Sequence, residues 1–180
     1  MNRILIFSFG IAAAFSALVF QIMATIVFPA LENSTSLEKI GAFMFVTIFI
    51  EEFVKFILLW KISQNSKTQK NIFWSSIILG SGFATAEIFL NFLNNNPSDT
   101  NLFFSYLGLF LLHILTSSVY SLYLSKKKNL AIWSTLAIFG FGYFLHFLFN
   151  FFVYSSINPL SLDCALIIFI LLTCYLNKKA

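Results

Sequence analysis

Glu51 and Glu52 stand side by side within an apolar stretch of the chain, and Lys55 follows one helical turn later. Charged side chains at the depth of a bilayer are costly, so they persist mainly where they face a protein interior and serve a function. A buried glutamate can act as a general base, and histidine can donate to a developing oxyanion or bind a metal. Other apolar stretches contain three further ionisable residues: Glu87, His113 and His146. With a trapped water, such groups are sufficient for hydrolysis of a peptide bond.

These residues recur with polar neighbours at one spacing. The pairs are 51/55, 87/91, 113/117 and 146/150, and positions four apart lie on one face of a helix. In the last pair, Asn150 can donate an amide N–H to the same oxyanion as a histidine. The spacing therefore predicts that four helices each present a polar face to one shared site, with Lys55 and Asn150 in supporting positions.

The two adjacent glutamates cannot both face the centre of such a site, because neighbouring residues point about 100° apart around a helix. We assign Glu51 to the centre as the general base. Glu52 would then orient its neighbours or pair with Lys55, and the reverse assignment also fits the spacing. Lys55 has an alternative of its own, since a lysine near the inner end of a span can extend to the lipid headgroups.

The composition indicates where this site lies. The 180-residue chain is 59% hydrophobic and 10% charged, whereas soluble domains carry roughly 25% charged residues. We therefore expect an integral membrane protein in contact with the lipid bilayer. The sequence contains no basic patch with interleaved aromatic residues, so we expect no nucleic-acid partner. We interpret the two cysteines, Cys164 and Cys174, as buried structural thiols.

Six apolar runs approach or exceed the length of about 20 residues that crosses a bilayer as a helix. We interpret the first as a retained span, because it is about twice as long as the apolar part of a usual signal peptide. Residues 1–180 are thus predicted to form a single all-α integral membrane domain, with spans two to five as a four-helix catalytic core. The predicted spans are Ile4–Pro29, Ile40–Trp60, Asn71–Leu93, Leu102–Leu124, Leu130–Val153 and Leu160–Leu176.

The distribution of positive charge predicts the orientation. If the six spans alternate in direction, every lysine and arginine except Lys39 and Lys55 falls on one side. The positive-inside rule then places both termini in the cytoplasm. We expect the protein to lie in the cytoplasmic, inner membrane. Glu51 and His113 lie near the middle of their spans, and Glu87 and His146 lie nearer the outer ends, so the mouth of the site is expected to face the outer side.

Motifs on spans two to five resemble those of a known family. Glu51-Glu52-Phe53-Val54-Lys55 fits E-E-x-x-K, Phe83 and Glu87 fit F-x-x-x-E, and His113 and the pair His146 and Asn150 follow in order. In this order the chain resembles the PrsW family of intramembrane proteases, which are related to the CAAX prenyl endopeptidases and the CPBP (Abi) membrane proteases. Lys55 and Glu87 favour PrsW, because the CPBP motifs E-E-x-x-x-R and F-x-x-x-H carry arginine and histidine.

The resemblance implies an intramembrane endopeptidase that cleaves a membrane-anchored protein, such as an anti-sigma factor, near the outer face. It also implies which residues carry the activity. These are Glu51, Glu52, Glu87, His113 and His146.

The resemblance leaves the cofactor open. Glu87, His113 and His146 could form an open zinc site. They come from three spans without an H-E-x-x-H motif, so we favour a glutamate-activated water with histidine and asparagine as oxyanion donors. Two other functions stay open: a small proton- or ion-coupled transporter, and a catalytically inactive homologue that binds membrane partners.

Overall fold

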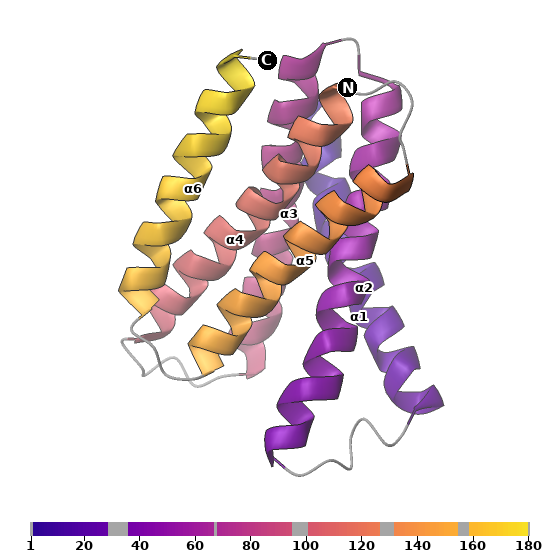
Figure 1. Ribbon diagram of the computed structural model, residues 1–180. Helices are drawn as coiled ribbons and strands as arrows, with labels where there is room; N and C mark the ends of the chain where they lie inside the picture. Colours follow the sequence, from indigo (N-terminus) through magenta and orange to yellow (C-terminus); the bar gives the residue numbers. More distant parts are fainter. Residues whose placement is uncertain are drawn as a thin grey trace.

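The computed structural model describes residues 2–28, 36–66, 68–94, 101–126, 132–154 and 159–179. Within these ranges the chain is helical and contains no strand, and the described part of each predicted span falls on one helix; Pro29, Leu130 and Ala131 lie outside the described residues. The all-α fold with six helices is therefore confirmed (Figure 1). The helices are α1 (Arg3–Val27), α2 (Ser36–Gln64), α3 (Gln69–Asn94), α4 (Asn101–Lys126), α5 (Ile132–Tyr154) and α6 (Pro159–Lys179).

Local sequence explains where several helices begin. The side chain of Asn2 accepts a hydrogen bond from the backbone N–H of Ile4 at 3.0 Å and so caps α1. The hydroxyl of Thr68 accepts one from the N–H of Asn71 at 3.3 Å at the start of α3. α6 begins at Pro159, whose fixed φ and missing N–H suit the first position of a helix.

Among the described residues, five helices are long and apolar enough to cross a membrane. The exception is α2, which carries Glu51, Glu52 and Lys55. At 29 residues α2 still exceeds the length of a span. Its other face exposes large apolar side chains such as Phe49 and Phe53. The protein is therefore an integral membrane protein in which α2 turns its charged face inward.

The centre of the bundle is α4, which packs against α2, α3, α5 and α6. It is the most buried of the five helices that are long and apolar enough to cross a membrane. On its other side α3 packs against α1. A Cβ atom at Gly82 of α3 would lie 2.2 Å from the carbonyl oxygen of Phe7 in α1, and one at Gly80 would lie 2.6 Å from that of His113 in α4. Glycine thus permits the close approach of α3 to both neighbours, as is common between membrane helices.

α6 packs mainly against α4 and leaves much of its surface exposed. Cys164 is exposed and Cys174 is partly exposed. Our interpretation of both cysteines as buried thiols was wrong, because α6 lies at the edge of the bundle and buries only one stripe of its surface.

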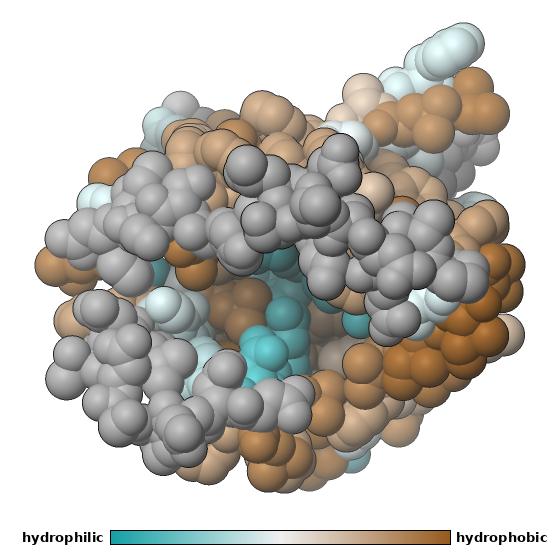
Figure 2. Space-filling model, turned by 90° about the horizontal axis from the view of Figure 1, so that it is seen from below, coloured by the Kyte–Doolittle hydropathy of each residue, from teal (hydrophilic) through white to brown (hydrophobic). Residues whose placement is uncertain are grey.

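Both chain termini lie at the same end of the bundle (Figure 1). Seen from the opposite end, the surface is hollowed between the helices and hydrophilic residues line the hollow (Figure 2). A cavity of about 340 Å³ lies between α1, α2, α3 and α5. Its lining includes Glu51, Glu87 and the carboxamides of Gln21, Asn91 and Asn150. We call this space the site cavity.

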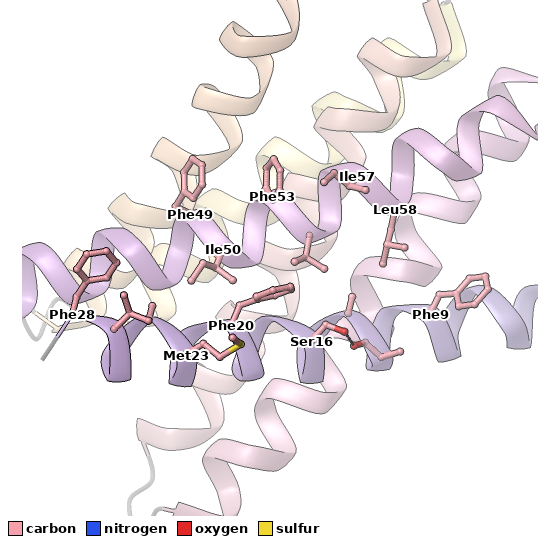
Figure 3. A pocket seen from close by; sticks show the side chains of 15 residues that line it. Phe9, Ser16, Phe20, Met23, Phe28, Phe49, Ile50, Phe53, Ile57 and Leu58 are labelled. Atoms are coloured by element: carbon pink, nitrogen blue, oxygen red, sulfur yellow. Dashed lines mark hydrogen bonds between the residues drawn. The ribbon is translucent and has the colours of Figure 1, made fainter. Parts of the chain in front are cut away.

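A second, larger space of about 640 Å³ lies between α1 and α2 and is lined almost entirely by apolar side chains, among them Phe9, Phe20 and Phe53 (Figure 3). The two spaces share no lining residue: Ile50 faces this apolar groove, whereas its neighbour Glu51 faces the site cavity. The pair of helices α1 and α2 therefore separates an apolar surface from a polar interior.

Candidate active site

The ionisable residues singled out in the sequence converge on one cluster. α2 contributes two glutamates, and α3, α4 and α5 contribute one residue each. The rings of His113 and His146 contact each other edge to face, with their centroids 5.2 Å apart. The cluster thus joins the four helices of the predicted core: its members are Glu51, Glu52, Glu87, His113 and His146.

Glu52 lies at the buried centre of the cluster and has three hydrogen-bonded partners. Its Oε1 accepts from Lys55 Nζ at 2.5 Å and lies 2.6 Å from His146 Nδ1, and its Oε2 accepts from the hydroxyl of Tyr120 at 2.7 Å. Glu52, Lys55 and Tyr120 are all fully buried. Buried charges are tolerated when they are paired and hydrogen-bonded in this way.

The ammonium of Lys55 contacts polar side chains of α2 and α4 and lies over the ring of Phe83 in α3. Besides Glu52, its Nζ lies 2.9 Å from His113 Nδ1 and donates to Thr116 Oγ1 at 3.1 Å. The alternative in which Lys55 extends to the lipid headgroups is therefore wrong. We call Glu52, Lys55, Thr116 and Tyr120 the inner layer of the site.

Glu51 and Glu87 form an outer layer at the site cavity. Glu51 Oε2 lies 3.6 Å from His146 Nε2, and its Oε1 accepts a hydrogen bond from Gln21 Nε2 at 2.7 Å. Glu87 Oε2 lies 2.5 Å from His113 Nε2. The side chains of Glu51 and Glu87 are 14% and 24% exposed, whereas both histidines are fully buried. Each histidine therefore bridges the two layers, with Nδ1 inward and Nε2 outward.

Of the supporting residues, Asn150 lines the site cavity and Lys55 belongs to the inner layer. Three further residues of the site were not predicted from the sequence: Gln21, Thr116 and Tyr120. Gln21 could have been found by the same criterion as the others, because it is a carboxamide within an apolar span. Tyr120 gave no such signal, since tyrosine is common in apolar helices. The site thus includes α1, which lay outside the predicted four-helix core.

Comparison with known proteins now adds a second line of evidence. Residues 2–176 match the model of the PrsW family intramembrane metalloproteases. The chain belongs to this family. The match extends beyond residues 51–150, on which the resemblance rested, and it makes the protein an intramembrane protease, a hydrolase. No curated protein and no solved structure matches the chain.

Membership of a family of metalloproteases favours a metal over the metal-free mechanism that we preferred from the sequence. Glu52, His113 and His146 offer ligand atoms that lie within 4.8 Å of one another and could hold an ion. This set contains Glu52 where we expected Glu87. Two of its members, Glu52 and His113, also contact the ammonium of Lys55. By contrast, His146 Nε2 is buried without a hydrogen-bond partner among the described residues.

Proposed function

We propose that this PrsW-family protease cleaves a peptide bond of a membrane-anchored protein, such as an anti-sigma factor, near the outer face of the cytoplasmic membrane. The observation that carries the proposal is the position of Glu51 and Glu87. They line a polar cavity inside an otherwise apolar bundle, next to the Nε2 atoms of both histidines. Such a cavity lets water and a peptide reach these carboxylates, whereas surrounding lipid would keep water and the peptide away from them.

The residues present fit a divalent metal such as zinc, whose catalytic sites combine histidine and carboxylate ligands with an open position. We propose that His146, through Nε2, and the carboxylate of Glu87 would hold it, and that Glu51 stays free to act as the base. The unpartnered Nε2 of His146 supports this set, as does the Lys55 ammonium, which already occupies Glu52 and His113 Nδ1. When bound, the ion would polarise the scissile carbonyl and make a bound water nucleophilic at neutral pH.

Side chains in and beside the site cavity would transfer the proton of the water and stabilise the negative charge that develops on the substrate. Glu51, which lies next to His146 Nε2, accepts the proton of the attacking water and returns it to the leaving amine. His113 and Asn150 donate hydrogen bonds to the oxyanion, a contribution that is typically worth several kcal/mol. Gln21 holds Glu51 by one oxygen and leaves the other directed at the histidine.

The function can be tested in two steps. A comparison of membrane proteins between a deletion strain and the parent strain identifies a protein that accumulates uncleaved. That protein is then co-expressed with Glu51→Gln and His146→Ala variants, both of which we expect to accumulate in the membrane without cleaving it. Cleavage at the parental rate by both variants would exclude the proposed protease site.

Removal of the metal tests the ligand set. We expect a chelator to abolish cleavage by the purified protein and Zn²⁺ to restore it. Metal content, measured by mass spectrometry, should fall in Glu87→Gln and His146→Ala and persist in Glu52→Gln. A loss of metal in Glu52→Gln with full retention in Glu87→Gln would instead place the ion among Glu52, His113 and His146.

A further inference from the structure

The two histidines have partners of opposite chemistry at Nδ1. His113 Nδ1 lies 2.9 Å from the Nζ atom of Lys55. An ammonium group has three donors and no acceptor, so this ring nitrogen must accept the hydrogen bond. The proton of a neutral His113 is therefore on Nε2, from which it donates to the carboxylate of Glu87 at 2.5 Å.

His146 has the reverse arrangement. Its Nδ1 lies 2.6 Å from Glu52 Oε1, and an ionised carboxylate only accepts hydrogen bonds. The proton of a neutral His146 is therefore on Nδ1, and its Nε2 carries a lone pair. This Nε2 is buried, has no hydrogen-bond partner in the described part of the chain, and lies 3.6 Å from Glu51 Oε2.

We infer that Glu52, Lys55 and Tyr120 are positioning residues that hold His113 and His146 in opposite tautomers. His113 then directs an N–H at Glu87, and His146 directs a lone pair toward Glu51, the two glutamates that line the site cavity. The assignment of catalytic tasks rests on the proposed function: the N–H suits an oxyanion, whereas the lone pair suits a metal ion. A carboxylate on the far nitrogen is the usual partner of a metal-binding histidine.

Tyr120 completes this arrangement from α4. Its hydroxyl donates to Glu52 Oε2 and so fixes the orientation of the carboxylate whose Oε1 faces Lys55 and His146. The ring packs edge to face on Phe56, with the centroids 5.3 Å apart. Space for the hydroxyl comes from Gly142 of α5, where a Cβ atom would lie 2.3 Å from it. A side chain at position 142 would therefore push Tyr120 away from Glu52.

Nitrogen NMR can read the tautomers directly, because the chain contains only two histidines. In metal-free protein labelled with ¹⁵N-histidine, we expect one ring protonated on Nδ1 and the other on Nε2. His146→Ala should remove the first set of signals, and Zn²⁺ should shift Nε2 of His146 alone. Identical tautomers for both rings would overturn the inference. This measurement does not depend on cleavage, so its failure is distinct from failure of the proposed function.

Activity tests the role of the Tyr120 hydroxyl. Tyr120→Phe removes a hydrogen bond that orients the Glu52 carboxylate, so kcat should fall about 10- to 100-fold with KM unchanged. The labelled protein should show His146 exchanging between tautomers. In the Glu52→Gln background the same substitution should cause little further loss, because the hydroxyl acts through Glu52.

Matched variants keep this test decisive. Tyr123→Phe, on the same helix but bonded to Thr135, should keep the parental kcat and the parental NMR spectrum. If Tyr120→Phe does not fold, Gly142→Ala supplies the same displacement of the hydroxyl and the same tautomer readout. Parental kcat and unchanged His146 signals in Tyr120→Phe or Gly142→Ala would overturn the positioning role.

Discussion

Lys55 is a buried cation whose three polar contacts are all side chains of the site: Glu52, His113 and Thr116. In an apolar bundle a charge that loses its partner has no water to replace it, so the cost of removing one partner exceeds the value of the pair itself. The same lysine fixes the ring of His113 and neutralises Glu52. Stability and chemistry are thus joined at one side chain.

This coupling predicts that Lys55→Met destabilises the protein by about 3–5 kcal/mol, because the Glu52 carboxylate is left buried and unpaired. The double variant Glu52→Gln/Lys55→Met should regain much of that stability, because neither charge remains. Its activity should stay low, since both histidines lose their Nδ1 partners. Thermal unfolding in detergent measures the first effect and cleavage measures the second.

Lys61→Met provides the control, because Lys61 is an exposed residue of the same helix. It should unfold at the parental temperature. If Lys55→Met also unfolds at that temperature, the buried ion pair contributes nothing to the fold.

The sequence was enough to identify most residues of the site, but not all of the contacts between them. Glutamates and histidines stand out in apolar spans, and the 100° separation of Glu51 and Glu52 correctly implied different surroundings. Glu52 pairs with Lys55, as assigned from the sequence. Which glutamate faces α4 depends on how α2 is rotated against that helix, and the pattern along one helix does not contain that rotation. Tyr120 was missed for a related reason: its hydroxyl matters only because Gly142, on another helix, leaves room for it.

Among the helices, α3 is the one whose position the site depends on most. It lies between α1 and α4, and both contacts are close enough to require glycine. The approach at Gly80 brings the backbone of α3 against the carbonyl of His113 itself. The hydrogen bond between Glu87 and His113 thus depends on an interhelical distance set two turns away.

Gly80→Ala adds only one methyl group, but we expect it to lower the activity clearly. A Cβ atom there would lie 2.6 Å from the carbonyl oxygen of His113, so α3 and α4 must move apart and Glu87 withdraws from the ring. We expect a fall in kcat together with a lower unfolding temperature. Gly140→Ala is the matched control, because a Cβ atom at that position meets nothing within 4 Å.

Gly140→Ala should be neutral or slightly stabilising, since alanine favours a helix over glycine by about 1 kcal/mol. Equal activity in the two glycine variants would show that the spacing of α3 and α4 does not control the site.

The helices themselves were predictable because a bilayer imposes a minimum length on every span. Their packing was not predictable, because all six helices are apolar on most sides. The hydrophobic periodicity of such helices does not indicate which neighbour each one packs against. Gln21 illustrates the consequence. The residue was visible in the first span, but its place in the site follows from the packing of α1 on α3, which Gly10 and Gly82 permit.

At the scale of the whole molecule, the polar hollow lies at the end of the bundle away from both termini (Figure 2). If the termini are cytoplasmic, as the positive charges indicate, substrate must approach from outside. In a chain without Cys164 and Cys174, we expect Phe28→Cys to react with an impermeant maleimide added to intact cells. Asn65→Cys, at the opposite end, should react only after the cells are opened.

The reverse labelling pattern would show that the protein has the opposite orientation in the membrane, with the site on the cytoplasmic side. The fold and the geometry of the cluster would stand unchanged, but an outward-facing substrate would no longer be consistent with the hollow.

The charged face of α2 also bears on how the protein enters the membrane. A single lysine or acidic residue at the centre of a helix costs the insertion machinery about 2.5–3.5 kcal/mol, and α2 brings three such groups. Gln21 of α1 and the Glu52–Lys55 pair are present early, but four further partners are synthesised later, on α4 and α5: Thr116, Tyr120, His113 and His146. α2 is therefore expected to wait at the translocon, or at the lipid boundary, until more than half of the chain has left the ribosome.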